Sequence, residues 1–167
     1  MPLLNEYNRV FPKYTLHNNR HQVNIIKLIG DLLGDDVTEL TALECAMLIL
    51  STVYHDIGMV YNDKELEKIG TKSDFKLFLD RNTKAQLEYE ENQNKPTAGL
   101  IECYCRWMHA KRVWIYLNIS NSSTPLKWDN ISIKDALGSL CESHNLSVKD
   151  IIVDLDTKAS QEIFMDI

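Results

Sequence analysis

Residues 41–54 (TALECAMLILSTVY) place apolar side chains on almost every face of a helix. A helix of that kind is usually buried in the middle of a domain. Thr41 and Glu44 stand at capping-box spacing, so the helix is expected to begin there. The segment therefore predicts a central helix, and this helix delivers an adjacent imidazole and carboxylate, His55 and Asp56, from the core.

Other parts of the chain also show apolar side chains at helical spacing. Further long helices are expected over 15–34, 98–119 and 132–144. Thr15 is expected to cap the first of them, and Ser132 the last. A short extended element or β-hairpin is expected near 126–132. The predicted fold class is therefore an all-α helical bundle with one short hairpin.

Residues 60–96 are the most polar part of the chain. Short amphipathic helices are expected there, over 63–69, 73–79 and 83–91. Because this segment directly follows the His-Asp pair, it is either a lid over a binding site or a solvated helical excursion. The sequence leaves both interpretations open.

Length and charge bound the function. A chain of 167 residues has the usual size of one domain, so a single domain is expected over 1–167. A formal charge of −6 and a pI of about 5.3 argue against broad binding of duplex nucleic acid or an anionic membrane. The chain shows no leader and no apolar run of about 18 residues. Its four cysteines fit no common zinc signature, so reduced thiols in the cytoplasm are expected.

The His55-Asp56 pair could bind one metal ion, because a neutral imidazole nitrogen and a carboxylate oxygen are good ligands for first-row metals, but a site needs further ligands. The remaining histidines are His17, His21, His109 and His144. His17 and His21 are four residues apart and could share one ion from a single helix face, with Arg20 beside them. Taken singly, each histidine would more often be an ordinary surface or core residue.

His109 has an arginine on each side at helical spacing, Arg106 and Arg112. This pattern suits an anionic ligand, because a metal polarises one phosphoryl oxygen while a guanidinium binds others in a fork. The alternative is a surface ion pair of Arg106 with Glu102. His144 is expected at the exit of its helix, where many histidines only interact with the helix dipole.

These residues, in this order, resemble the HD superfamily of metal-dependent phosphohydrolases. The resemblance rests on His21 with an aliphatic residue four positions later, on His55-Asp56, and on the segments RWMH (106–109) and CESHN (141–145). The last two segments are similar to the third and fourth histidine positions of two-metal branches, including HD-GYP proteins. The resemblance covers roughly residues 12–150. The closest likeness is an HD-CE-like bacterial branch, in which such a domain heads a longer protein with an Hsp90-like ATPase region.

The resemblance implies a site with one or two divalent ions, either Mn, Fe or Ni, or Mg. His21, His55 and Asp56 would hold the first ion, and His109 and His144 would hold a second or contact phosphate. A metal-activated water would then attack phosphorus, with Asp56 positioning it and Arg106 or Arg112 neutralising charge. The implied substrate is a nucleotide or phosphodiester, and its contacts are expected at His17, Arg20, Arg106 and Arg112.

The sequence departs from this family at its C-terminal end, where no helix carries the expected metal-binding aspartate. We expect a truncated domain, although a partner chain could supply the ligand, or Asp154, Asp156 or Asp166 could replace it. Two other functions remain open. One is a metal-holding module that senses a nucleotide for an attached domain without turnover, and the other gives the histidines a purely structural role.

Overall fold

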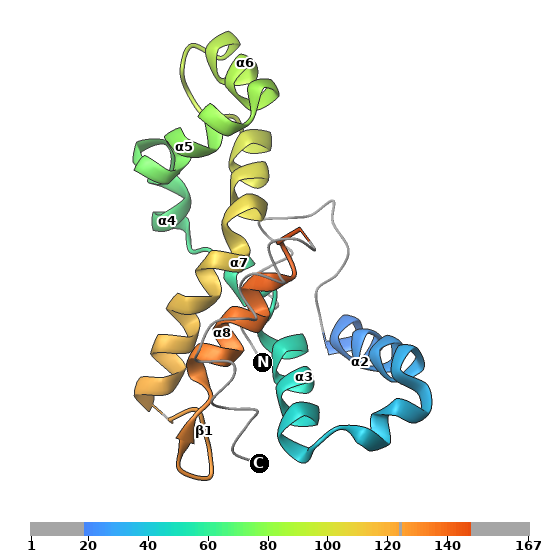
Figure 1. Cartoon of the computed structure of the whole chain (residues 1–167). Helices are drawn as coiled ribbons and strands as arrows, with labels where there is room; N and C mark the ends of the chain where they lie inside the picture. Colours follow the sequence, from blue (N-terminus) through green and yellow to red (C-terminus); the bar gives the residue numbers. More distant parts are fainter. Residues whose placement is uncertain (1–18, 124, 148–167) are drawn as a thin grey trace. The chain divides into compact units, whose positions relative to one another are not determined.

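The fold is all-α with one short hairpin, as the sequence predicted (Figure 1). The computed structural model describes residues 19–123 and 125–147. These residues form two compact units. Unit 1 contains 59–109, and unit 2 contains 19–58 and 110–147. The long helix α7 (Ala98–Ser123) contributes its first part to unit 1 and its second part to unit 2.

Unit 2 is built from three helices besides its part of α7. They are α2 (Asn19–Leu33), α3 (Ala42–Tyr54) and α8 (Lys134–Ser143), with the 3-10 helix η2 (Gly34–Glu39) between the first two. The helix α3 packs against both α2 and α8. The buried apolar side chains of this unit come mainly from α3, α7 and α8. They are Leu43, Met47, Ile57, Val113, Leu117, Ile133, Leu137 and Cys141. The predicted helix thus contributes to the core of unit 2, whereas the burial expected on almost every face is wrong for Ile49, which is 49% exposed.

The start of α3 is fixed by the predicted capping box. The Thr41 hydroxyl accepts from the backbone N–H of Glu44, and the Glu44 carboxylate accepts from the backbone N–H of Thr41. Both bonds satisfy backbone donors that a helix start otherwise leaves unpaired. Because the first residue is fixed, the position of the last turn, which carries His55, is fixed as well.

Unit 1 holds the polar segment, and its helices agree closely with the predicted ones. They are α4 (Asp63–Glu67), α5 (Ser73–Arg81) and α6 (Thr83–Glu91), with the 3-10 helix η4 (Ile69–Thr71) between the first two. Aromatic rings from α5, α6 and α7 form its core in tilted and edge-to-face pairs, including Phe75, Phe78 and Tyr104. The Tyr104 hydroxyl donates to Asp74 at 2.7 Å. The role of this segment as a lid stays a prediction.

The hairpin pairs β1 (Lys127–Trp128) with β2 (Ile131–Ser132) in antiparallel register. The predicted Ser132 cap is wrong, because Ser132 belongs to β2 and pairs with Lys127. The residue before α8 is Ile133, which makes no side-chain cap and is buried in the core. Burial of this isoleucine therefore sets where α8 begins. At its other end, α7 continues to Ser123, four residues beyond the predicted end.

Some predictions fall on residues that the structure does not describe. The Thr15 cap and the candidate aspartates Asp154, Asp156 and Asp166 lie outside the described residues. Within the described part of the chain, no single helix is long and apolar enough to cross a membrane. One pair of helical segments, 42–59 with 63–71, has the length and composition of a membrane span when the two are taken together, but the pair is bent by 57°.

Candidate metal site

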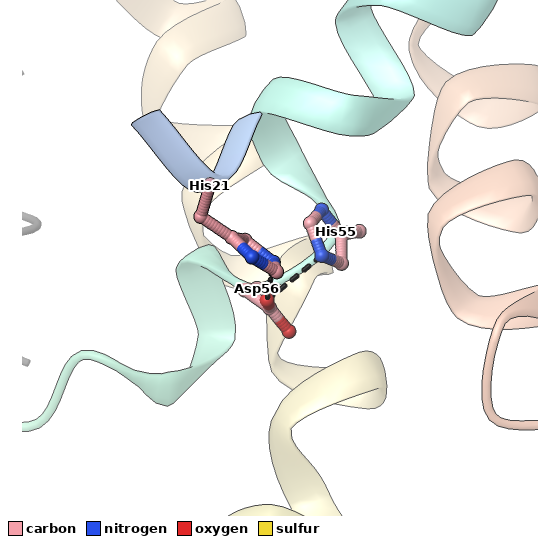
Figure 2. A group of neighbouring side chains, drawn as sticks. All are labelled: His21, His55 and Asp56. Atoms are coloured by element: carbon pink, nitrogen blue, oxygen red, sulfur yellow. Dashed lines mark ion pairs between the residues drawn. The ribbon is translucent and has the colours of Figure 1, made fainter. Parts of the chain in front are cut away.

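Three predicted ligands, His21, His55 and Asp56, come together in unit 2. Figure 2 shows both imidazoles directed toward the Asp56 carboxylate, with His21 carried by α2 and the other two residues by the turn that directly follows α3. The His55 Nε2 lies 2.7 Å from Asp56 Oδ2, and the His21 Nε2 lies 3.9 Å from the same oxygen. The side chains are largely shielded from solvent, since the most exposed, His21, is 26% accessible. The sequence predicted this group although His21 and His55 are 34 positions apart.

The geometry fits a divalent ion. One ligand atom from each of the three residues lies within 4.8 Å of the other two. Ligands that bind one ion at about 2.1 Å are at most about 4.2 Å apart, so small side-chain movements would close the group on an ion. Three protein ligands of the type His, His and Asp leave coordination positions for water and substrate, as in catalytic rather than structural metal sites.

Two long-range hydrogen bonds hold the elements that carry these ligands. The Gln22 side-chain amide donates to the Val53 carbonyl at 3.2 Å, which ties the start of α2 to the last turn of α3. The Arg112 Nε donates to the Gly58 carbonyl at 2.9 Å, two residues after Asp56. Each hydrogen bond thus joins a residue one or two positions after a predicted ligand to a second helix. The backbone around the three ligands is therefore fixed by α2, α3 and α7 within one unit.

The hydrogen bonds of His55 fix its ring. Its Nδ1 lies 2.9 Å from the Thr52 carbonyl, and its Nε2 faces Asp56. Burial lowers the pKa of His55, but the hydrogen bond and charge of Asp56, with the Thr52 carbonyl, outweigh burial and hold the pKa above its ordinary value of 6.5. When Nδ1–H donates to Thr52, a metal can replace the proton on Nε2, and binding then releases a proton.

His144 lies beside this group, and its ring is held in the same way as that of His55, by a contact of Nδ1 with the carbonyl three residues earlier. It follows the last residue of α8, as predicted, and its Nδ1 contacts the carbonyl of Cys141. Its ring meets that of His55 edge to face, with centroids 5.4 Å apart and an angle of 87°. Its assignment as a ligand stays a prediction.

The neighbouring Cys141 is part of the apolar core of unit 2. Its thiol is buried, and burial raises its pKa to about 12. It donates to the Ser51 carbonyl at a sulfur to oxygen distance of 3.8 Å. Burial and the hydrogen bond to the backbone both favour the protonated thiol.

A pocket of about 180 Å3 opens beside His55 and His144. Its lining comes from three helices of unit 2: Ile25 and Ile29 of α2, Ser51, Thr52 and His55 at the end of α3, and Leu140 and His144 at the end of α8. This pocket was not predicted from the sequence. The signal was present in Ile25 and Ile29, which follow His21 at intervals of four residues and so lie on the same helix face.

The remaining predicted site residues are distributed over both units. Arg20 is exposed in α2, next to His21. His109 and Arg106 belong to unit 1, where the His109 Nδ1 contacts the Arg106 carbonyl. Arg112 is buried and donates to the backbone, a contact that the sequence did not predict. His17 lies outside the described residues. Substrate and ligand roles for these five residues stay predictions.

A comparison with protein families finds one match, to the family described as HD-CE, over residues 11–164. The chain belongs to the HD-CE family. Neither a search of curated proteins nor a search of solved structures gave a match. The family match confirms the predicted HD-type domain, and the His and Asp group in unit 2 provides residues that could bind a metal in this HD-CE chain.

Two residues that support the site were missed from the sequence. The Gln22 side-chain amide donates to the Val53 carbonyl, and the Thr52 carbonyl contacts the ring of His55, so both contacts help to orient the predicted ligands. Gln22 could have been found, because a polar side chain next to His21 on a helix that packs into the core needs a partner. A backbone carbonyl such as that of Thr52 leaves no trace in the sequence.

Proposed function

We propose that this HD-CE chain is a metal-dependent phosphohydrolase that acts on a nucleotide or another phosphate ester. The observation that supports this most directly is the convergence of His21, His55 and Asp56, with ligand atoms within 4.8 Å of one another. A His, His and Asp set with coordination positions left for other ligands suits phosphate ester hydrolysis, since water and a phosphoryl oxygen can both enter.

A divalent ion held by these residues supplies a Lewis acid and a source of hydroxide near neutral pH. Asp56 has the central position, because its carboxylate faces both imidazoles and brings the negative charge that a cation needs. The three residues His21, His55 and Asp56 are called the ligand group below. The contact of His55 with the Thr52 carbonyl orients its ring toward the other two members of this group. Under this proposal Arg20, exposed on α2 and next to His21 in the sequence, would bind a phosphoryl oxygen of the substrate.

The first test is elemental analysis of the purified full chain, beside a double variant His55→Ala/Asp56→Ala. We expect near-stoichiometric Mn, Fe or Ni in the original chain, as isolated or after dialysis against Mn or Ni, and loss of the metal in the double variant. The matched control is Asp135→Ala, which removes an exposed carboxylate of α8 that pairs with Lys134. This control should keep the metal.

Turnover is then measured with phosphomonoester and phosphodiester substrates in the presence of the ion found. Release of phosphate or alcohol that disappears in the double variant supports the enzyme. Tight binding of a nucleotide without any release would instead indicate a sensing module. Absence of metal from the original chain, even after dialysis, would refute the proposed function.

A further inference from the structure

We propose that the pocket beside His55 receives a flat, uncharged and apolar ring that is part of the phosphate ester. This inference rests on the proposed function and specifies the substrate class of the same site. His55 connects the two, because it belongs to the ligand group and also lines the pocket. A phosphate held at the ligand group can therefore direct its organic substituent into the pocket.

The size of the pocket limits what it can hold. A volume of about 180 Å3 is below the roughly 300–1,000 Å3 of pockets that enclose whole drug-sized ligands. The pocket therefore accommodates a single ring or a short alkyl group and leaves the rest of the ligand outside. The phosphate lies at the His55 end under this proposal, where a cation and imidazoles would be available to it.

The walls of the pocket favour an apolar group. Ile25 and Ile29 form one side and Leu140 another. The polar side chains among them are engaged within their own helix, since the hydroxyls of Ser51 and Thr52 both donate to the Leu48 carbonyl at 2.9 Å. A nucleobase brings donors and acceptors on its edges, and aliphatic walls leave such groups without partners.

The aromatic end of the pocket favours a ring over an alkyl chain. The imidazoles of His55 and His144 both line the pocket and stand edge to face. A third ring can join such a pair in an offset or edge-to-face arrangement. The combination of aliphatic walls with an aromatic end thus points to an aryl group rather than a nucleobase or a short alkyl group.

The test uses the full chain, first titrated with Mn2+ and Ni2+ and then with three non-hydrolysable probes: phenylphosphonate, 4-pyridylphosphonate and methylphosphonate. Calorimetry is expected to give the tightest binding for phenylphosphonate, with a dissociation constant about tenfold or more below that of methylphosphonate, because the ring is buried against apolar walls. The pyridyl probe has the same shape with a polar ring edge and should bind more weakly than the phenyl probe.

Three variants show whether this preference comes from the pocket. Ile29→Phe and Leu140→Phe fill it from two different helices and should abolish the phenyl preference while metal binding remains. Val23→Phe is the matched control, since Val23 lies on α2, is half exposed and does not line the pocket. This control should keep the preference. If one filling variant fails to bind metal, the other is compared with the control.

Each other outcome overturns the inference in a recognisable way. If the chain binds no metal, the proposed function fails and the inference fails with it. If metal binds but phenyl and methyl probes bind equally, or neither binds, the inference alone fails. Tightest binding of the pyridyl probe would indicate a polar ring such as a nucleobase. An unchanged phenyl preference in both filling variants would place the ring elsewhere.

Discussion

At the scale of single residues, Asp56 is the most informative position, because both histidine ligand atoms face its carboxylate. We expect Asp56→Asn to reduce metal affinity by more than the roughly 10–100-fold that is lost when only a supporting partner is removed. The amide keeps the shape of the side chain but removes the negative charge. Metal titration of the variant, with Asp135→Asn as the control, measures the effect. Unchanged affinity would show that Asp56 is not a ligand.

Arg112 gives a second prediction at this scale. Its buried guanidinium donates to the Gly58 carbonyl, and Arg112→Met keeps the length of the stem but removes the donor. We expect the free energy of unfolding to fall by about 1–3 kcal/mol, because a buried carbonyl then lacks its partner. Denaturant unfolding of the full chain measures this loss. Unchanged stability with lost phosphate binding would instead support the substrate role that the sequence indicated.

The sequence predicted residue types at the site better than it predicted their supports. His21, His55 and Asp56 were predicted as one group because metal ligands belong to few residue types and because the resemblance to the HD superfamily marks these positions. The partner of Arg112 could not be found, because it is a backbone carbonyl 54 residues away. A side chain that binds a carbonyl and one that binds phosphate look the same in a sequence.

At the scale of elements, the close approach of α7 and α8 depends on Gly138. A Cβ at this position would lie 2.4 Å from the Trp114 ring, whose Nε1 also donates to Glu142 of α8. We expect Gly138→Ala to lower the free energy of unfolding by about 1–3 kcal/mol, as overpacking of a core does. Denaturant unfolding measures the change, with Gly30→Ala as the matched control.

The control should behave in the opposite way. A Cβ at Gly30 would meet nothing within 4 Å, and the residue lies inside α2. Alanine is about 0.5–1 kcal/mol more favourable than glycine within a helix, so Gly30→Ala should stabilise the chain slightly. Equal effects of the two substitutions would contradict the close packing of Trp114 on Gly138. These two glycines could not be distinguished from the sequence, because both lie within helical patterns.

The capping box of α3 predicts a dependence of stability on pH. Bonds from the backbone N–H and the side chain of Thr41 lower the pKa of Glu44 below its ordinary value of 4.5. A lowered pKa stabilises the fold above the unfolded value, and the stabilisation is lost as the pH falls through the folded value. We expect the original chain to be more stable than Glu44→Gln at neutral pH and to lose this advantage below pH 4.5. Urea unfolding at several pH values measures it.

Correct and incorrect predictions of elements have a common cause. The boundaries of α3 and of the short helices in unit 1 were predicted well, because caps and spacing are local signals. The start of α8 was predicted wrongly at Ser132, because pairing of β2 and burial of Ile133 decide it. Tertiary packing overrides a local capping preference in this case.

At the scale of the whole molecule, the sequence predicted a single domain, and the described residues form two compact units that share α7. The single-domain assignment stays a prediction. The group of His21, His55 and Asp56, which could hold a metal, lies entirely within unit 2, whereas the predicted ligand His109 belongs to unit 1. The response of each unit to metal can therefore test whether the site is confined to one of them.

Hydrogen exchange with and without Mn2+ makes this test. Because His21 connects α2 to the end of α3, metal at 100 times its dissociation constant should stabilise segments 19–25 and 51–58 by up to about 2.7 kcal/mol. The control His21→Ala should lose the protection of 19–25 and retain part of it at 51–58. Unchanged exchange at 19–25 in the original chain would exclude His21 as a ligand. Added protection around His109 would extend the site into unit 1, as expected if that histidine holds a second ion, whereas its absence would confine the site to unit 2.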